Sequence, residues 1–402
     1  DAWAELRRGK EMAEAAVAYL LSVAPDPSVV MSHLLRESTA VAEAAVHSSA
    51  GAGAGGAVEL AWVEAAARDA DPGRRHLAAA ALALMDGQGS TLLPALLADS
   101  DREVQREAIR TAGKLKSKDQ INTLLPFIAK PGVRAEALEA LAAYGDNMCD
   151  RLSELLGDDA VSPAIRVQIP RALKLMPTQK CVDVLVKATG LGNLAVRSSV
   201  LKALNSLRIR APRLDYHEKI VNERILAEAR EYFELNAALV GLPDYKKTGA
   251  ATRLLVRTIE GRLNFSVERL FRLLGLRYPP VEIYSAYLAY RNRRGEELST
   301  AMEFLDNTLD KDLRRVVMPM LDEPDHAHEM GRRLFGLEKR EPEAAIRDLI
   351  ASGDPWLVAC AIATAGELKM TGLAPDIQAA AKRAGEETGR VADQALEALA
   401  CS

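Results

Sequence analysis

The stretch DREVQREAIRTAGKL, residues 101–115, decides the fold. It opens on Asp101, whose carboxylate can accept hydrogen bonds from the free N–H groups at the start of a helix. A β-branched residue, Val104, and a base, Arg106, follow, and apolar residues then recur at spacings of three and four. This spacing predicts a helix that buries one apolar stripe.

Versions of this stretch recur along the chain with a period of about thirty residues. They begin at residues 71, 131, 163, 193 and 354. A small or apolar anchor recurs in steps of 30, 29, 32 and 31 residues, at Ala78, Ala108, Ala137, Ile169 and Val200. Further anchors are expected at Ala301, Ala361 and Ala395. A fixed period of this length indicates a repeat architecture.

Each repeat is expected to hold two short helices. The pairs Asp71-Pro72 and Asp354-Pro355 combine a capping residue with a proline in the first turn, so the second helix should begin there. Another apolar helix lies between anchors, as at residues 91–97. Two such helices cannot bury their apolar faces alone and must stack on neighbouring repeats. The Asp and Arg residues of the repeats are interpreted as structural, bonding between neighbouring units.

This pattern resembles the HEAT-like repeats of bacterial proteins, in a more compact form than the usual period of about 40 residues. The resemblance implies an all-α fold, an α-α superhelical repeat solenoid. The low aromatic content, 4% against 49% hydrophobic residues, fits a core of Ala, Leu and Val in closely stacked helices.

The repeat pattern breaks between residues 210 and 291. One long helix is predicted over residues 215–242, followed by Pro243-Asp244 as the cap of a second long helix that ends near Gly275. A further helix is expected over residues 281–290. The predicted segments are 1–57 (N-terminal helices, with a helix over 2–23, and a Gly/Ala linker at 50–57), 58–209 (repeats), 210–291 (the irregular long-helix segment) and 292–402 (C-terminal repeats).

The irregular segment is also the basic part of the chain. The whole chain has a net charge of −4, but residues 205–295 hold 17 Lys and Arg against 10 Asp and Glu. Six arginines are the candidate partner-binding residues: Arg253, Arg257, Arg262, Arg269, Arg272 and Arg277. They could dock an acidic protein surface or an anionic membrane. The alternatives are a solvated helix face and an insert that only bends the array.

Composition and motifs argue against several classes of function. The net negative charge argues against a nucleic-acid binder. Four cysteines at 149, 181, 360 and 401 show no CxxC spacing, so neither a disulfide framework nor a zinc site is predicted, and a reducing compartment fits. No apolar run approaches the roughly 20 residues that span a bilayer. Because the chain begins at Asp1 without Met, it is expected to be a processed product or a piece of a longer protein.

No motif predicts catalysis, a cofactor or a metal. Residues 51–56 satisfy GxGxxG, but the preceding residues look helical, whereas a dinucleotide site needs a strand there. His326 and His328 stand two apart on a predicted helix, so their imidazoles should not converge on an ion. No P-loop, GxSxG or HExxH motif is present. The chain is therefore predicted not to be an enzyme, and no small-molecule substrate is evident.

Four later segments, at residues 270–280, 301–309, 313–321 and 352–357, suggest a narrower resemblance. Over residues 200–372 the chain is similar to the soluble HEAT-repeat region of bacterial nucleotide-transporter-like membrane proteins of the ATP/ADP-carrier type. In that family a membrane half precedes the region, and a cyclic-nucleotide-binding-like domain often follows it. The resemblance implies a cytoplasmic coupling region at the cytosolic face of the inner membrane, with Asp1 just past the last membrane helix.

The leading hypothesis is therefore a non-catalytic coupling scaffold that contacts a protein partner or adjoining domains of the same polypeptide. One alternative is a free-standing soluble HEAT scaffold that binds a protein on its concave face. A remote alternative is a HEAT-like lyase-type subunit that handles a tetrapyrrole.

Overall fold

The computed structural model describes residues 2–6, 10–52, 58–85, 87–116, 120–243, 249–293, 295–322, 324–383 and 385–400. Over these residues all regular structure is helical, with no strand. The chain divides into two compact units, unit 1 (Asp1–Val184) and unit 2 (Leu185–Ser402). The predicted all-α repeat fold is confirmed.

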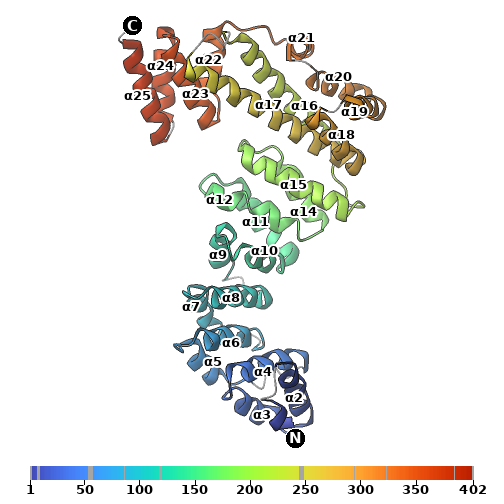
Figure 1. The fold of residues 1–402 in the computed structure, drawn as a ribbon, viewed down its shortest axis with the longest axis vertical. Coiled ribbons are helices and arrows are strands. Elements are labelled where there is room, and N and C mark those ends of the chain that lie inside the picture. The colour runs from blue at the N-terminus through green and yellow to red at the C-terminus, as the bar shows by residue number, and fades with distance from the viewer. Residues whose placement is uncertain are drawn as a thin grey trace. The chain divides into compact units, whose positions relative to one another are not determined.

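Unit 1 is a series of short helices (Figure 1). They are α1 (Ala2–Glu5), α2 (Lys10–Val23), α3 (Pro27–Leu34), α4 (Thr39–Ala52), α5 (Leu60–Ala67), α6 (Pro72–Leu82), α7 (Leu93–Leu97), α8 (Arg102–Leu115), α9 (Ile121–Leu124), α10 (Arg134–Ala142), α11 (Cys149–Gly157), α12 (Pro163–Arg166) and α13 (Ile169–Leu173), with the first part of α14 (Gln179–Ala188). The second helices of successive repeats pack directly on one another, α6 on α8, α8 on α10 and α10 on α13.

Unit 2 contains two much longer helices. Its helices are α15 (Leu194–Arg210), α16 (Glu218–Gly241), α17 (Ala250–Arg277), α18 (Pro280–Asn292), α19 (Gly295–Thr308), α20 (Lys311–Met320), α21 (Pro324–Phe335), α22 (Pro342–Ile350), α23 (Pro355–Glu367), α24 (Ala374–Arg383) and α25 (Glu386–Ala400). The 24 residues of α16 and the 28 of α17 lie side by side (Figure 1). Helix α17 also packs on α15, α18 and α23, so it joins repeats that are far apart in sequence.

The anchors predicted from the repeat are buried. Ala78, Ala108, Ala137, Ile169 and Val200 are all 0% exposed, and the later anchors Ala301, Ala361 and Ala395 are buried as well. Small residues at these contacts let backbones approach closely. At Gly113 on α8, an added Cβ would lie 2.6 Å from Cα of Ala140 on α10. In unit 2, a Cβ at Gly366 would lie 3.1 Å from Cα of Ala395.

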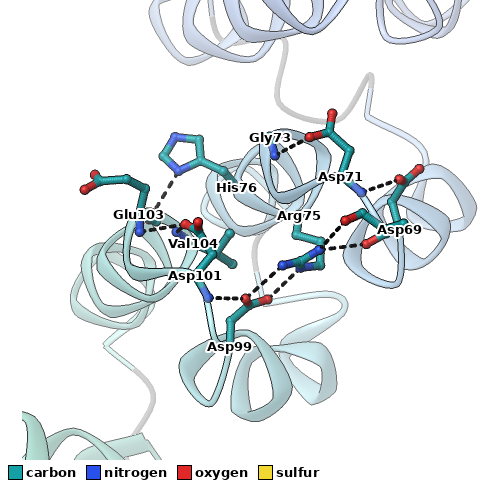
Figure 2. A network of polar contacts seen from close by, with 10 residues as sticks. Asp69, Asp71, Gly73, Arg75, His76, Asp99, Asp101, Glu103 and Val104 are labelled. Atoms are coloured by element: carbon teal, nitrogen blue, oxygen red, sulfur yellow. Dashed lines mark hydrogen bonds and ion pairs between the residues drawn. The ribbon is translucent and has the colours of Figure 1, made fainter.

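The acidic and basic residues of the repeats have different roles (Figure 2). Asp71 and Asp101 cap their own helices, since their carboxylates accept hydrogen bonds from Gly73 N and from Glu103 and Val104 N. Arg75 instead reaches the next repeat, where its Nε and Nη2 donate to Asp99 at 2.7 and 3.0 Å. Bonding between repeats is therefore confirmed for Arg75, whereas Arg134 and Arg166 bond within their own units, as these aspartates do.

Two boundary predictions need correction or lie partly outside the described residues. The single helix expected over 2–23 is two helices, α1 and α2. Helix α4 extends through Ala52 into the expected Gly/Ala linker, whose residues 53–57 lie outside the described part. The four-segment division stays a prediction beside the two observed units.

The cap expected at Asp244 also lies outside the described residues, and α17 begins only at Ala250. A residue distant in sequence caps this helix. The carboxylate of Glu367, on α23, accepts hydrogen bonds from the backbone N of Ala251 and Thr252 at 2.9 and 3.0 Å. Burial would raise the pKa of Glu367, but hydrogen bonds from Thr252 and Ala251 outweigh this effect and lower it.

We predict that Gly113→Ala destabilises unit 1 although Ala is the better helix former. The new methyl group meets the α10 backbone, and overpacking of this kind costs about 1–3 kcal/mol. The matched control is Gly261→Ala, also within a helix, where nothing lies within 4 Å of an added Cβ. This control should gain about 0.5–1 kcal/mol from propensity. Chemical unfolding measures both, and equal gains in the two variants would contradict the close approach.

Candidate partner-binding groove and the arginines of helix α17

A groove of about 820 Å³ opens in unit 2. It lies between the start of α15, the helices α16 and α17, and the connection from α22 to α23. Its lining includes residues 192–195, Glu231, Glu234, Leu235, Ala238, Arg262, Arg340, Asp348, Leu349, residues 352–355 and Leu357. The groove thus forms where the two long helices interrupt the repeat.

Two repeat helices begin at this groove. Asn193 caps α15 by accepting hydrogen bonds from Ala195 and Val196 N, both at 3.1 Å. Asp354 caps α23 in the same way, accepting from Trp356 N at 3.1 Å. Both caps belong to the pattern that the sequence shows, and both line the groove. Their side chains hold the two ends of the groove in fixed positions.

The lining carries more negative than positive charge. It holds four carboxylates, from Glu231, Glu234, Asp348 and Asp354, and two guanidiniums, from Arg262 and Arg340. Each guanidinium pairs with an aspartate of the lining, Arg262 with Asp354 and Arg340 with Asp348. The two glutamates remain, and their partners Arg197 and Arg230 are not part of the lining. A cationic ligand would therefore compete with Arg197 and Arg230 for these two glutamates.

Two polar atoms of the lining are buried without a hydrogen-bond partner among the described residues. They are Nε of Arg262 and Oγ of Ser352. Buried donors are nearly always satisfied in folded proteins, so an orphan calls for a partner. Both can donate a hydrogen bond.

The arginines predicted to form one docking surface have several different environments. Arg269 is only 6% exposed and donates three hydrogen bonds to Glu228, itself buried on α16. Ser266 and Arg197 also donate to this carboxylate. Because its guanidinium is enclosed, Arg269 is not available at the surface.

Of the other five, three are held by acidic neighbours. Arg262 pairs with Asp354 in the groove, and Arg272 pairs with Glu268 one turn away. Arg277 pairs with Glu218 and Asp310.

Arg253 and Arg257 are exposed near the start of α17. Exposed apolar side chains, Leu254 and Phe265, lie on the same helix. Docking by this end of the helix stays a prediction.

Sequence reasoning found Asp354 as a cap and Arg262 as a candidate, but it missed the acidic residues of the groove. Glu231, Glu234 and Asp348 meet only because α16 packs on α22. No spacing in the sequence signals that contact. The histidines singled out earlier lie on α21, where His326 contacts Asp322 at 2.5 Å. Among the described residues, the one group of His, Cys, Asp and Glu that could share an ion contains neither histidine.

We predict that Arg269→Met destabilises unit 2 by about 3–5 kcal/mol, because it leaves the buried Glu228 carboxylate without its main partner. Arg257→Met, on the exposed face of the same helix, should stay within about 0.5 kcal/mol. Denaturant unfolding measures the difference. If both variants unfold alike, the buried pair is not the structural element proposed here.

The described helices include none with the length and apolar character needed to cross a membrane.

Comparisons with known proteins agree with the repeat interpretation. The family model of HEAT repeats matches residues 89–163. No curated protein matches the chain. The family match does not reach residues 200–372, so the resemblance of that region to transporter-like proteins stays a prediction.

Solved structures align with the chain at low identity and with low TM-scores. An engineered protein aligns over 90% of this chain and 96% of its own, with 15% identity and a TM-score of 0.32. The karyopherin Kap121p aligns over 99% of this chain with 9% identity and a TM-score of 0.38, but this chain spans only 48% of it. Importin beta aligns over 96% of this chain and 51% of its own, with 13% identity and a TM-score of 0.28. These values carry no information on partners. The described residues thus form an all-α fold, and residues 89–163 match the family model of HEAT repeats.

Proposed function

We propose that the chain is a non-catalytic protein-binding scaffold whose groove in unit 2 holds an extended, basic segment of a partner protein. The observation that carries the proposal is the lining of the groove, with four carboxylates against two guanidiniums. HEAT repeats and related solenoids commonly serve as interaction surfaces, which supports the class of function.

The charges of the lining favour a basic ligand. Glu231 and Glu234 keep 47% and 46% of their side chains exposed and pair with arginines outside the lining. Ion pairs at such exposure contribute about 0–1 kcal/mol. A lysine or arginine of a bound segment can therefore replace them at little cost. Arginine also offers the planar fork that fits a carboxylate with two hydrogen bonds.

The size and polarity of the groove favour an extended segment over a folded surface. A volume of about 820 Å³ holds a few side chains and not a domain. Leu235 and Leu357 contribute apolar surface beside the carboxylates. The segment that fits best carries basic and apolar side chains in alternation.

A display library of random 12-residue peptides tests this proposal on the full chain. We expect enrichment of peptides with Lys or Arg next to apolar residues. The double variant Glu231→Lys/Glu234→Lys should bind the selected peptides at least about tenfold more weakly, equivalent to about 1.4 kcal/mol. The control Glu386→Lys/Glu387→Lys changes the net charge equally on the exposed start of α25 and should bind as the parent does. Peptides that bind the groove variant undiminished would contradict the proposal.

A finer proposal concerns the setting of the scaffold. We propose that it is the cytosolic coupling region of a nucleotide-transporter-like membrane protein, with Arg253 and Arg257 facing an acidic adjoining domain or anionic lipid. The exposed Leu254 and Phe265 on the same helix favour a contact surface there. The proposal rests on the sequence resemblance of residues 200–372.

The native reading frame tests this setting. About a dozen apolar segments of roughly 20 residues upstream of Asp1 are expected for a transporter-like protein. A start codon near Asp1 without such segments would leave the free-standing scaffold, and the groove proposal would be unaffected.

A further inference from the structure

Two cysteines that are remote in sequence meet in unit 1. Cys149 is the first residue of α11 and Cys181 lies in the first turn of α14, and their Sγ atoms are 2.8 Å apart. Asp146 Oδ1 lies 3.9 Å from Cys149 Sγ. The ligand atoms of all three residues lie within 4.8 Å of one another. The two thiols therefore lie close together although the sequence has no CxxC spacing.

The repeat explains this meeting. Cys149 and Cys181 are 32 residues apart, and so are Asp146 and Thr178. The sequence thus places Asp-x-x-Cys at the start of one repeat helix and Thr-x-x-Cys at the start of the next. Because successive repeats stack, matching positions become neighbours. A search for pairs one period apart would have found the cluster.

The donor set suits a thiophilic divalent cation. Zinc binds thiolate sulfur at about 2.3 Å and carboxylate oxygen at about 2.0–2.2 Å. A tetrahedral ion then sets two sulfurs about 3.8 Å apart and sulfur and oxygen about 3.5 Å apart. The two Sγ atoms must therefore separate by roughly 1 Å, which small rotations about χ1 supply. The present spacing of Cys149 Sγ and Asp146 Oδ1 is already close to the required one.

Neighbouring residues support the carboxylate as a ligand. The hydroxyl of Thr178 donates to Asp146 Oδ1 at 2.6 Å and so fixes the orientation of the carboxylate. The positive charge of nearby Lys180 would repel a metal cation, but its Nζ donates a hydrogen bond to Asp150 at 2.8 Å. Both thiols are 0% exposed, whereas Asp146 is exposed and leaves a side open to solvent.

We propose that Asp146, Cys149 and Cys181 bind one Zn²⁺ ion that clips two neighbouring repeats together. On binding, each thiol releases one proton and its sulfur forms a bond to the ion, so one Zn²⁺ enters and two protons leave. Water takes the fourth position. The site has three protein ligands instead of four, so one coordination position is open to solvent.

The same sulfurs could instead form a disulfide, which requires removal of two electrons and two protons by an oxidant such as a peroxide. That bond would use the thiolates that the metal needs. Metal binding and disulfide formation therefore exclude one another, and the experiment must start from reduced protein.

The test uses the full chain, reduced, freed of metal and titrated with Co²⁺ as a spectroscopic substitute for Zn²⁺. We expect a sulfur-to-cobalt charge-transfer band that saturates at one equivalent and disappears when Zn²⁺ is added. Cys149→Ser and Cys181→Ser should each abolish the band. Thr178→Val should weaken Co²⁺ binding about 10–100-fold.

Controls separate a metal site from a structural pair of thiols. Cys360→Ser should keep the band, because this buried cysteine lies in unit 2 beside Thr258. Asp146→Asn alters an exposed side chain and should fold normally by circular dichroism, yet lower the Co²⁺ affinity. Zn²⁺ should raise the Tm of the parent and leave that of Cys149→Ser unchanged. Absence of the band in reduced protein, or a band that survives in both cysteine variants, would overturn the proposal.

Discussion

The array depends on helices that touch at small side chains. Where Gly113 meets Ala140 there is no room for another methyl group, and where Gly366 meets Ala395 the fit is tight. This close approach allows short helices to bury a continuous apolar stripe that neither could bury alone. It also explains a composition that is rich in Ala and has only 4% aromatic residues, because rings at these positions would force the helices apart.

Stacking at a fixed period brings together residues about thirty positions apart. The long helices bring together residues that are further apart in the sequence. In the regular repeats, Arg75 reaches Asp99 and Cys149 reaches Cys181. Helix α17 joins more distant parts, so that Glu367 caps its start over a separation of 115 residues. The groove has the same origin, since its lining combines residues of α15, α16, α17 and the α22–α23 connection.

Local signals in the sequence predicted the local structure well. The anchors are buried, Asp71, Asp101 and Asp354 cap the helices that the pattern assigned to them, and the two long helices end within three residues of their predicted C-terminal limits. Predictions that depended on tertiary contact did less well. No prediction placed Glu367 at the start of α17, where it accepts hydrogen bonds from Ala251 and Thr252 N because α23 packs on α17. The acidic groove had no local signal at all.

The charge count of the middle segment illustrates why a surface cannot be inferred from composition. Residues 205–295 carry seven more basic than acidic residues, 17 against 10, which predicted a basic docking face. In the folded chain some of these charged side chains are buried and others are exposed. The buried carboxylate of Glu228, on α16, forms ion pairs with Arg269 and Arg197. A buried carboxylate requires such partners. Arg269 is therefore not available at the surface, whereas Arg197 also pairs with Glu231 of the groove. The basic middle segment therefore contributes to a groove whose lining has four carboxylates and two guanidiniums, and a basic ligand suits the half-exposed Glu231 and Glu234 there.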